Sequence, residues 1–166
     1  MVEHHTVYLA GKIEMNGWRE AFNYRNGYTP GDMTIQDLAN YSYKINNYLT
    51  ITGPTIIGCD HGCYHQPNSH GCKCEWEYLI PTLDNPDVLY ICKNQIERAE
   101  ILFAYIDCCD CYGTLAEIGY AHAYGKTIII KFATEELQKD MWFISQMQQI
   151  KGVSSEWIAE QLLSRV

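Results

Sequence analysis

The chain has 166 residues, which is enough for one domain with a buried hydrophobic core and does not require a second. Its net charge of -8, with no block of lysine or arginine, argues against a nucleic-acid polymer or an anionic membrane as partner and favours a small ligand. The sequence contains no membrane-span-length apolar segment and no basic N-terminal region before a long apolar one. We therefore expect a soluble, cytoplasmic protein.

The first half of the chain predicts two strands with an irregular stretch between them. A short apolar run predicts a strand over residues 6–10. Short helices are predicted near Trp18 and over residues 34–48, in a stretch rich in tyrosine and asparagine. A second buried strand is predicted over residues 55–59, and it leads into a loop, residues 59–74, that is rich in cysteine and histidine.

The second half alternates more regularly between helix and strand. Helices are predicted over residues 87–99, 114–124, 135–149 and 155–166, and strands over 101–106 and 127–132. Alternating strands and helices are typical of an α/β fold with a mainly parallel sheet flanked by helices. We therefore predict a single Rossmann-like (flavodoxin-like) domain over residues 1–166.

Loops that follow the predicted strands are the first candidates for a binding site. In open α/β sheets, ligands bind beyond the carboxyl ends of the strands, so these loops should face one crevice. The candidates from the first two loops are Gly11, Lys12, Asp60 and His61. The alternative interpretations are a solvated lysine at position 12 and a glycine-rich loop around Asp60 that local hydrogen bonds hold.

The segment GTLAEIG, residues 113–119, lies where the strand at 101–106 gives way to a helix. Glu117 is expected in the first turn of that helix, where unpaired amides and the positive dipole end favour an ionised carboxylate, as a nucleophile requires. Gly113 would allow a ligand to approach the backbone closely. The alternative is a capping box, in which Thr114 caps the helix and Glu117 returns a bond to the Thr114 amide.

Three segments together carry a family resemblance: VYLAGK at 7–12, AEILFAYID at 99–107 and GTLAEIGYAHAYGKTIII at 113–130. The chain resembles the nucleoside 2-deoxyribosyltransferase superfamily, which includes the related nucleotide N-glycosidases. The resemblance implies that Glu117, in the family's GT-x-x-E-x-G motif, is the nucleophile and that Tyr8 orients it. It also implies a homodimer or larger homo-oligomer, in which a neighbouring subunit completes the pocket.

The sequence departs from this family at one catalytic position. The family commonly has an Asp two residues before the motif glycine, where this chain has Cys111, and Asp110 lies one residue further back. Cleavage of an N-glycosidic bond passes through an oxocarbenium-like state, which the carboxylate of Glu117 would stabilise or attack. The departing base needs a proton or a hydrogen bond, which Asp110 or Asp107 would supply. We expect transfer of the (deoxy)ribosyl group to another base or to water, without a cofactor.

Two further residues are candidates for substrate contact. Arg19 would bind a phosphate if the substrate is a nucleotide, and Trp18 would stack on a base. The alternatives are a surface ion-pair partner at position 19 and a core aromatic residue at position 18. The CxxC spacing from Cys108 to Cys111 suggests redox chemistry, but we favour small residues that line a pocket.

Two other functions are compatible with the sequence. The loop at 59–74 has enough cysteine and histidine residues for a structural zinc ion, but it lacks the paired CxxC spacings of a zinc ribbon. A zinc-stabilised interaction domain is therefore one alternative to the enzyme. The other is a nucleotide-binding module that uses the same fold without catalysis.

Overall fold

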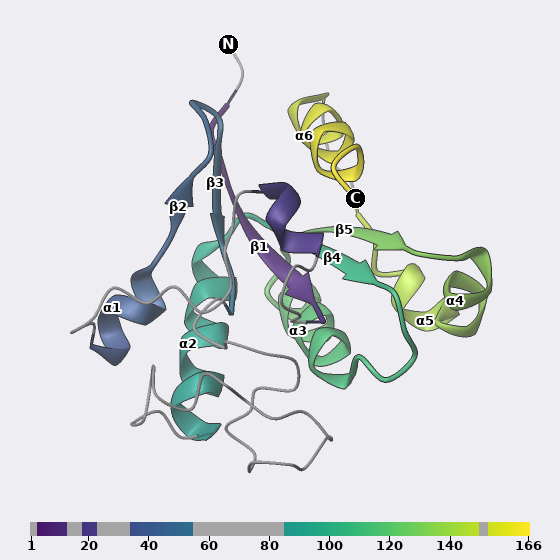
Figure 1. The fold of residues 1–166 in the computed structure, drawn as a ribbon, viewed down its shortest axis with the longest axis horizontal. Coiled ribbons are helices and arrows are strands. Elements are labelled where there is room, and N and C mark those ends of the chain that lie inside the picture. The colour runs from purple at the N-terminus through teal and green to yellow at the C-terminus, as the bar shows by residue number, and fades with distance from the viewer. Residues whose placement is uncertain (1–2, 13–17, 23–33, 55–84, 150–152) are drawn as a thin grey trace.

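The computed structural model describes residues 3–12, 18–22, 34–54, 85–149 and 153–166. They form an α/β fold, in which helices flank a five-stranded sheet with the strand order β2-β3-β1-β4-β5 (Figure 1). The strand predicted over residues 55–59 and the loop at 59–74 lie outside the described residues.

The sheet is mostly parallel. Its strands are β1 (His5–Gly11), β2 (Tyr43–Lys44), β3 (Leu49–Thr52), β4 (Ile101–Ile106) and β5 (Thr127–Phe132). β1 runs parallel to both β3 and β4, and β4 runs parallel to β5, whereas the short β2 is antiparallel to β3. The strands predicted at 6–10, 101–106 and 127–132 are therefore confirmed. Each is a near-continuous apolar run, as expected for parallel strands that are covered on both faces.

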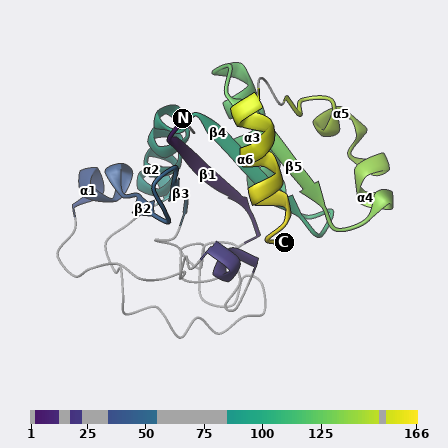
Figure 2. The same cartoon turned by 90° about the horizontal axis from the view of Figure 1, so that it is seen from above.

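Helices cover both faces of this sheet. They are η1 (Trp18–Phe22, a 3-10 helix), α1 (Ile35–Asn40), α2 (Asn85–Arg98), α3 (Tyr112–Ala123), α4 (Glu135–Asp140), α5 (Trp142–Ser145) and α6 (Val153–Leu163). α2 and α3 pack on one face, and α6 lies across the other (Figures 1 and 2). Among the described residues, no helix has both the length and the apolar character that crossing a membrane requires.

The alternation of side chains along β1 divides the hydrophobic core into two clusters. Val7 and Leu9 pack with Phe22 and the buried face of α6. Tyr8 and Ala10 point to the opposite face and pack against α2 and α3. The alternation therefore directs the hydroxyl-bearing side chain of Tyr8 toward α2 and α3.

The helix predicted over residues 34–48 is wrong beyond Asn40. Thr34 and Asp37 form a capping box at its start, which satisfies two backbone amides. The helix ends after Asn40 because Tyr41 is extended, with ψ 131°. The rest of the segment forms the β2–β3 hairpin, in which Leu49 and Ile51 become buried beside β1. β3 is a parallel strand that the sequence reasoning missed.

The helix predicted over residues 135–149 is also interrupted. α4 ends at Asp140, and Met141 has φ -97° and ψ 36°, so α5 starts in a new direction. This turn lets Met141, Ile144 and Met147, spaced three residues apart, pack against the cluster that contains Tyr8. The backbone amide of Gln149 then donates to the carbonyl of Ile128 across 2.9 Å.

Candidate active site

The sheet topology reverses between β1 and β4. From β1 the chain proceeds to β3 on one side, and from β4 it proceeds to β5 on the other. Such a switch point leaves a crevice at the carboxyl ends of the two strands, where α/β proteins bind ligands. Gly11 of β1 and its partner Tyr105 of β4 lie at this carboxyl end of the sheet.

A direct hydrogen bond joins Tyr8 and Glu117 at this place. The Tyr8 hydroxyl donates to Oε1 of Glu117 across 2.5 Å, between residues 109 positions apart in the sequence. Tyr8 is fully buried, whereas Glu117 of α3 is only partly buried. The pair is the one that the family resemblance implies, and the catalytic roles of its members stay predictions.

The position of Glu117 within α3 differs from the expectation. The helix begins at Tyr112 after Cys111, and the amide of Leu115 already donates to the carbonyl of Cys111 across 3.1 Å. Glu117 therefore lies in the second turn, where the helix dipole acts more weakly. The capping box is wrong for the same reason, because Thr114 is a buried residue inside the helix and does not precede it.

The surroundings of Glu117 favour its protonated form. Burial raises the pKa of Glu117 to about 7, although the hydrogen bond from Tyr8 and the positive charge of Arg19 both oppose this rise. Burial is also the main reason that the pKa of Tyr8 lies well above its ordinary value, so Tyr8 remains a donor. A carboxyl group that titrates near neutral pH suits acid, base or nucleophilic chemistry at that pH.

Arg19 of η1 is buried beside the end of β1, and its guanidinium is hydrogen-bonded to backbone carbonyls there. Its guanidinium donates to the carbonyls of Leu9 at 3.0 Å, Gly11 at 2.9 Å and Lys12 at 2.8 Å. The side chain is only 1% exposed. Arg19 therefore holds the chain as it leaves the sheet, and contact of Arg19 or of the Lys12 side chain with a phosphate stays a prediction.

Gly11 permits close packing at the carboxyl end of β1. Its φ is +147°, and an added Cβ would lie 2.8 Å from the Tyr105 carbonyl oxygen and 2.9 Å from Cζ2 of Trp18. The Trp18 ring packs against Phe22, Phe103 and Tyr105. Its buried Nε1 has no hydrogen-bond partner within the described parts of the chain. Trp18 is thus packed in the core, with a donor that no described residue accepts.

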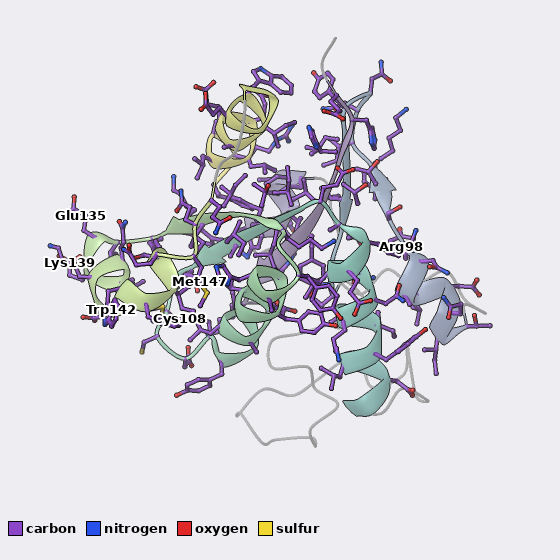
Figure 3. All side chains as sticks on the ribbon, turned by 180° about the vertical axis from the view of Figure 1, so that it is seen from behind. Arg98, Cys108, Glu135, Lys139, Trp142 and Met147 are labelled. Carbon is purple, nitrogen blue, oxygen red and sulfur yellow. The ribbon has the colours of Figure 1, made fainter. Side chains whose placement is uncertain are left out.

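Asp107 and Asp110 both lie near the Cys108 thiol, at the start of the loop between β4 and α3. Burial raises the pKa of the Cys108 thiol, and the nearby carboxylates of Asp110 and Asp107 raise it further. Cys108 and Met147 also pack against the core cluster of α3 (Figure 3). The Oδ1 atom of Asp107 is buried without a partner among residues that the structure describes, whereas Asp110 is exposed. Asp107 therefore has one acceptor to which no described residue donates.

The cysteines of this loop are reduced thiols. Cys108, Cys109 and Cys111 are all free, so the CxxC spacing forms no disulfide in this structure. Cys111 is buried and precedes α3 as its N-cap residue, without a side-chain capping bond. It therefore contributes a small buried side chain where the resembling family has a carboxylate.

One residue beside the Tyr8–Glu117 pair was missed by the sequence reasoning. Cys92 of α2 is a buried thiol whose pKa is raised to about 12, mainly by burial and then by the charge of Glu117. Its spacing relative to Ile96 and Ala99, four and seven residues later, indicated the buried face of a helix. Nothing in that spacing indicated that the thiol would lie close enough to Glu117 to be affected by its charge.

The remaining predicted site residues are not placed. Asp60, His61 and the rest of the loop at 59–74 lie outside the described residues, so a zinc ion there stays a prediction. Within the described ranges, no group of three or more His, Cys, Asp and Glu side chains is arranged to bind a metal ion. Comparison with known protein families found no family that matches this chain, and comparison with curated proteins found no match either.

Proposed function

We propose that this protein cleaves the N-glycosidic bond of a nucleoside or nucleotide, with Glu117 as the nucleophile on a Rossmann-like domain. The observation that carries the proposal is the contact between Tyr8 and Glu117 at the switch point of the sheet. It pairs a carboxyl group of raised pKa with a fixed donor at the edge where such sheets bind ligands.

The two carboxylate oxygens of Glu117 have different roles in the proposed reaction. Tyr8 donates to Oε1, which leaves Oε2 available to attack the anomeric carbon of the sugar. As the new C–O bond forms, the C–N bond breaks, and the base leaves with the bonding electron pair. Asp107 or Asp110 gives that base a proton or a hydrogen bond. A second base or water then attacks the anomeric carbon and gives its proton to the same Asp, and the C–O bond to Glu117 breaks to release the carboxylate.

Two unused polar atoms support a polar ligand at this edge. Nε1 of Trp18 is a donor and Oδ1 of Asp107 is an acceptor, and both are buried without partners in the described part of the chain. Buried polar groups in native proteins are almost always hydrogen-bonded, so an unpaired one points to a ligand or water. A nucleobase presents acceptors and donors along its edge and fits this requirement.

A binding module without catalysis is the second candidate, and one observation favours it. Cys111, and not a carboxylate, precedes α3 at the position where the family has an Asp, so a proton donor to the leaving base is missing there. A binding module would hold a nucleoside or nucleotide tightly and release no base.

Measurement of base release separates the two functions. The protein is incubated with a panel of nucleosides and nucleotides, with and without a second free base, and the products are resolved by chromatography. We expect free base or an exchanged nucleoside from the wild type, and none from Glu117→Ala or Glu117→Gln. Glu136→Gln, at an exposed glutamate of α4, is the matched control. Turnover by Glu117→Ala would remove the proposal, and the same experiment at several protein concentrations tests the expected homo-oligomer.

A further inference from the structure

Two buried polar atoms of opposite kind lack a hydrogen-bond partner among the described residues near the ends of β1 and β4. Oδ1 of Asp107 is an acceptor, and Nε1 of Trp18 is a donor. Nearly all buried polar atoms in native proteins are hydrogen-bonded, so each of these atoms calls for a partner. The partner of Asp107 must be a donor, and the partner of Trp18 must be an acceptor.

The sheet register places both atoms at the same end of the two central strands. Gly11 of β1 pairs with Tyr105 of β4, and Asp107 follows Tyr105 by two residues. The Trp18 ring packs against Tyr105 with 5.7 Å between the ring centroids, and its Nε1 would lie 3.0 Å from a Cβ at Gly11. The topology of the sheet switches between these strands, and α/β sheets bind ligands at such an end.

Asp107 is better suited to select a ligand than Asp110, the other carboxyl group of the loop. Asp110 is exposed, so water competes with a ligand for its oxygens. Asp107 as a residue is partly exposed, but its Oδ1 is shielded from water. A ligand that brings no donor to this oxygen leaves it unpaired, which costs binding free energy. Asp107 can therefore discriminate between ligands with and without a donor.

We propose that Asp107 accepts a hydrogen bond from an N–H group of the substrate's base and so selects bases that carry this donor. The inference rests on the proposed function and assigns a specificity-determining role within the same site. An ionised carboxylate accepts hydrogen bonds and donates none, so it disfavours a base edge that has only acceptors. Nε1 of Trp18 complements it, because the amino group of adenine lies beside a nitrogen that accepts. Asp110 is then left to protonate the departing base.

The test compares ligands that differ by a single amino group on the base. Adenosine is paired with purine riboside, and cytidine is paired with pyrimidin-2-one riboside, each with and without a 5′-phosphate. Kd is measured by isothermal titration calorimetry in the Glu117→Gln background, so that turnover does not disturb the binding. We expect the amino-bearing member of the better-bound pair to bind about 10- to 100-fold more tightly, which is the range for a hydrogen bond to a charged group.

Variants at Asp107 show whether this preference comes from its carboxyl group. Asp107→Ala removes the acceptor and should bring the preference close to unity, mainly by weakening the amino-bearing ligand. Asp107→Asn keeps one acceptor oxygen without the charge and should restore part of the preference. Asp140→Ala, at an exposed aspartate of α4, is the control and should leave the preference unchanged. If Asp107→Ala fails to fold, Asp107→Leu, which fills the space without an acceptor, is measured in its place.

A second set of ligands separates the base from the sugar and from water. 2′-Deoxyadenosine and 3′-deoxyadenosine are measured beside adenosine in the same variants. If Asp107→Ala removes a preference for a sugar hydroxyl and leaves the amino preference intact, the partner of Asp107 is the sugar. If every ratio is unchanged in Asp107→Ala, the partner is a water molecule. Either result, or the absence of an amino preference before Asp107 is changed, would overturn the inference.

The binding measurements distinguish this inference from the proposed function. Turnover that survives in Glu117→Ala would remove the nucleophile, while an amino preference that depends on Asp107 would still stand. Loss of the inference would in turn leave base release by Glu117 unaffected. If no nucleoside or nucleotide of the panel binds, both the inference and the proposed function are wrong.

Discussion

The Tyr8 hydroxyl donates to Oε1 of Glu117 across 2.5 Å and so links the central strand of the sheet to the second turn of α3. Tyr8 is one of the buried residues that pack against α3, and this face of β1 is set by the alternation of its side chains. The contact therefore depends on the packing of α3 against β1. The Tyr8 hydroxyl thus donates to a carboxyl group that changes its protonation state near neutral pH, because burial raises the pKa of Glu117 to about 7.

Removal of the Tyr8 hydroxyl should shift the pH dependence of catalysis upward. The hydrogen bond stabilises the ionised form of Glu117, so Tyr8→Phe should raise the pKa of Glu117 by about one unit, since such bonds contribute about 1.5–3 kcal/mol. Base release at pH 7 should fall about fivefold and recover above pH 9. Tyr120→Phe is the control, because Tyr120 of α3 donates to the exposed Glu97. An unshifted profile in Tyr8→Phe would contradict this prediction.

The raised pKa of Glu117 should reduce stability as the pH increases. Its folded pKa of about 7 exceeds the ordinary 4.5, so the folded state holds more protons than the unfolded state between these values. Stability should therefore fall as pH rises from 4.5 to 7. Because Glu117 is only partly buried, we expect a loss of about 1–2 kcal/mol, discounted for solvent screening.

Glu117→Gln should lose this pH dependence and be more stable than the wild type at pH 8. Urea unfolding of both proteins between pH 4.5 and 8 measures the difference, with Glu136→Gln as the exposed control. Parallel stability curves for the wild type and Glu117→Gln would show that the pKa of Glu117 is not raised.

Two glycines of α3 should respond differently to the same substitution. A Cβ at Gly113 or Gly119 would meet nothing within 4 Å, so either change to alanine should stabilise the helix by about 0.5–1 kcal/mol. Gly113 precedes Glu117 by four residues at the start of α3, where we expect the ligand to approach the backbone. Gly113→Ala should therefore raise KM, whereas Gly119→Ala should not. Equal KM values would place the ligand away from Gly113.

Arg19 should be less tolerant of lysine than an exposed arginine. Its planar guanidinium reaches three carbonyls at once, which a lysine ammonium on a flexible stem cannot match, so Arg19→Lys should cost about 1–3 kcal/mol. Arg165→Lys is the control, because Arg165 donates to the carbonyl of Ala21 at an exposed site. Thermal unfolding of both variants measures the difference, and similar melting temperatures would show that the buried contacts contribute little.

The parts of the fold that the sequence predicted well are those with strong hydrophobic patterning. β4 and β5 have the predicted bounds because each is an unbroken apolar run, and β1 and α2 differ from the prediction only at their ends. The predicted helices failed where contacts with other parts of the fold, and not the local pattern, decide the conformation. After α1 the chain forms strands, because pairing with β1 buries Leu49 and Ile51 in the sheet.

The candidate site was predicted in part, for similar reasons. A motif read along the sequence identified Glu117, but the start of α3 depends on backbone bonds such as that from Leu115 to Cys111. The pKa of Glu117 depends on burial, which spacing does not reveal. The effect of the Glu117 charge on Cys92 depends on how α2 packs against β1 and α3, so it required three-dimensional structure.

Detection of a covalent intermediate tests the proposed nucleophile most directly. The protein is mixed with the substrates of the nucleoside and nucleotide panel and quenched in acid within milliseconds to seconds, and its peptides are analysed by mass spectrometry. A ribosyl or deoxyribosyl adduct on Glu117, absent from Glu117→Gln, is the predicted result. An adduct on another residue, or continued base release by Glu117→Ala, would contradict the assignment of Glu117 as the nucleophile.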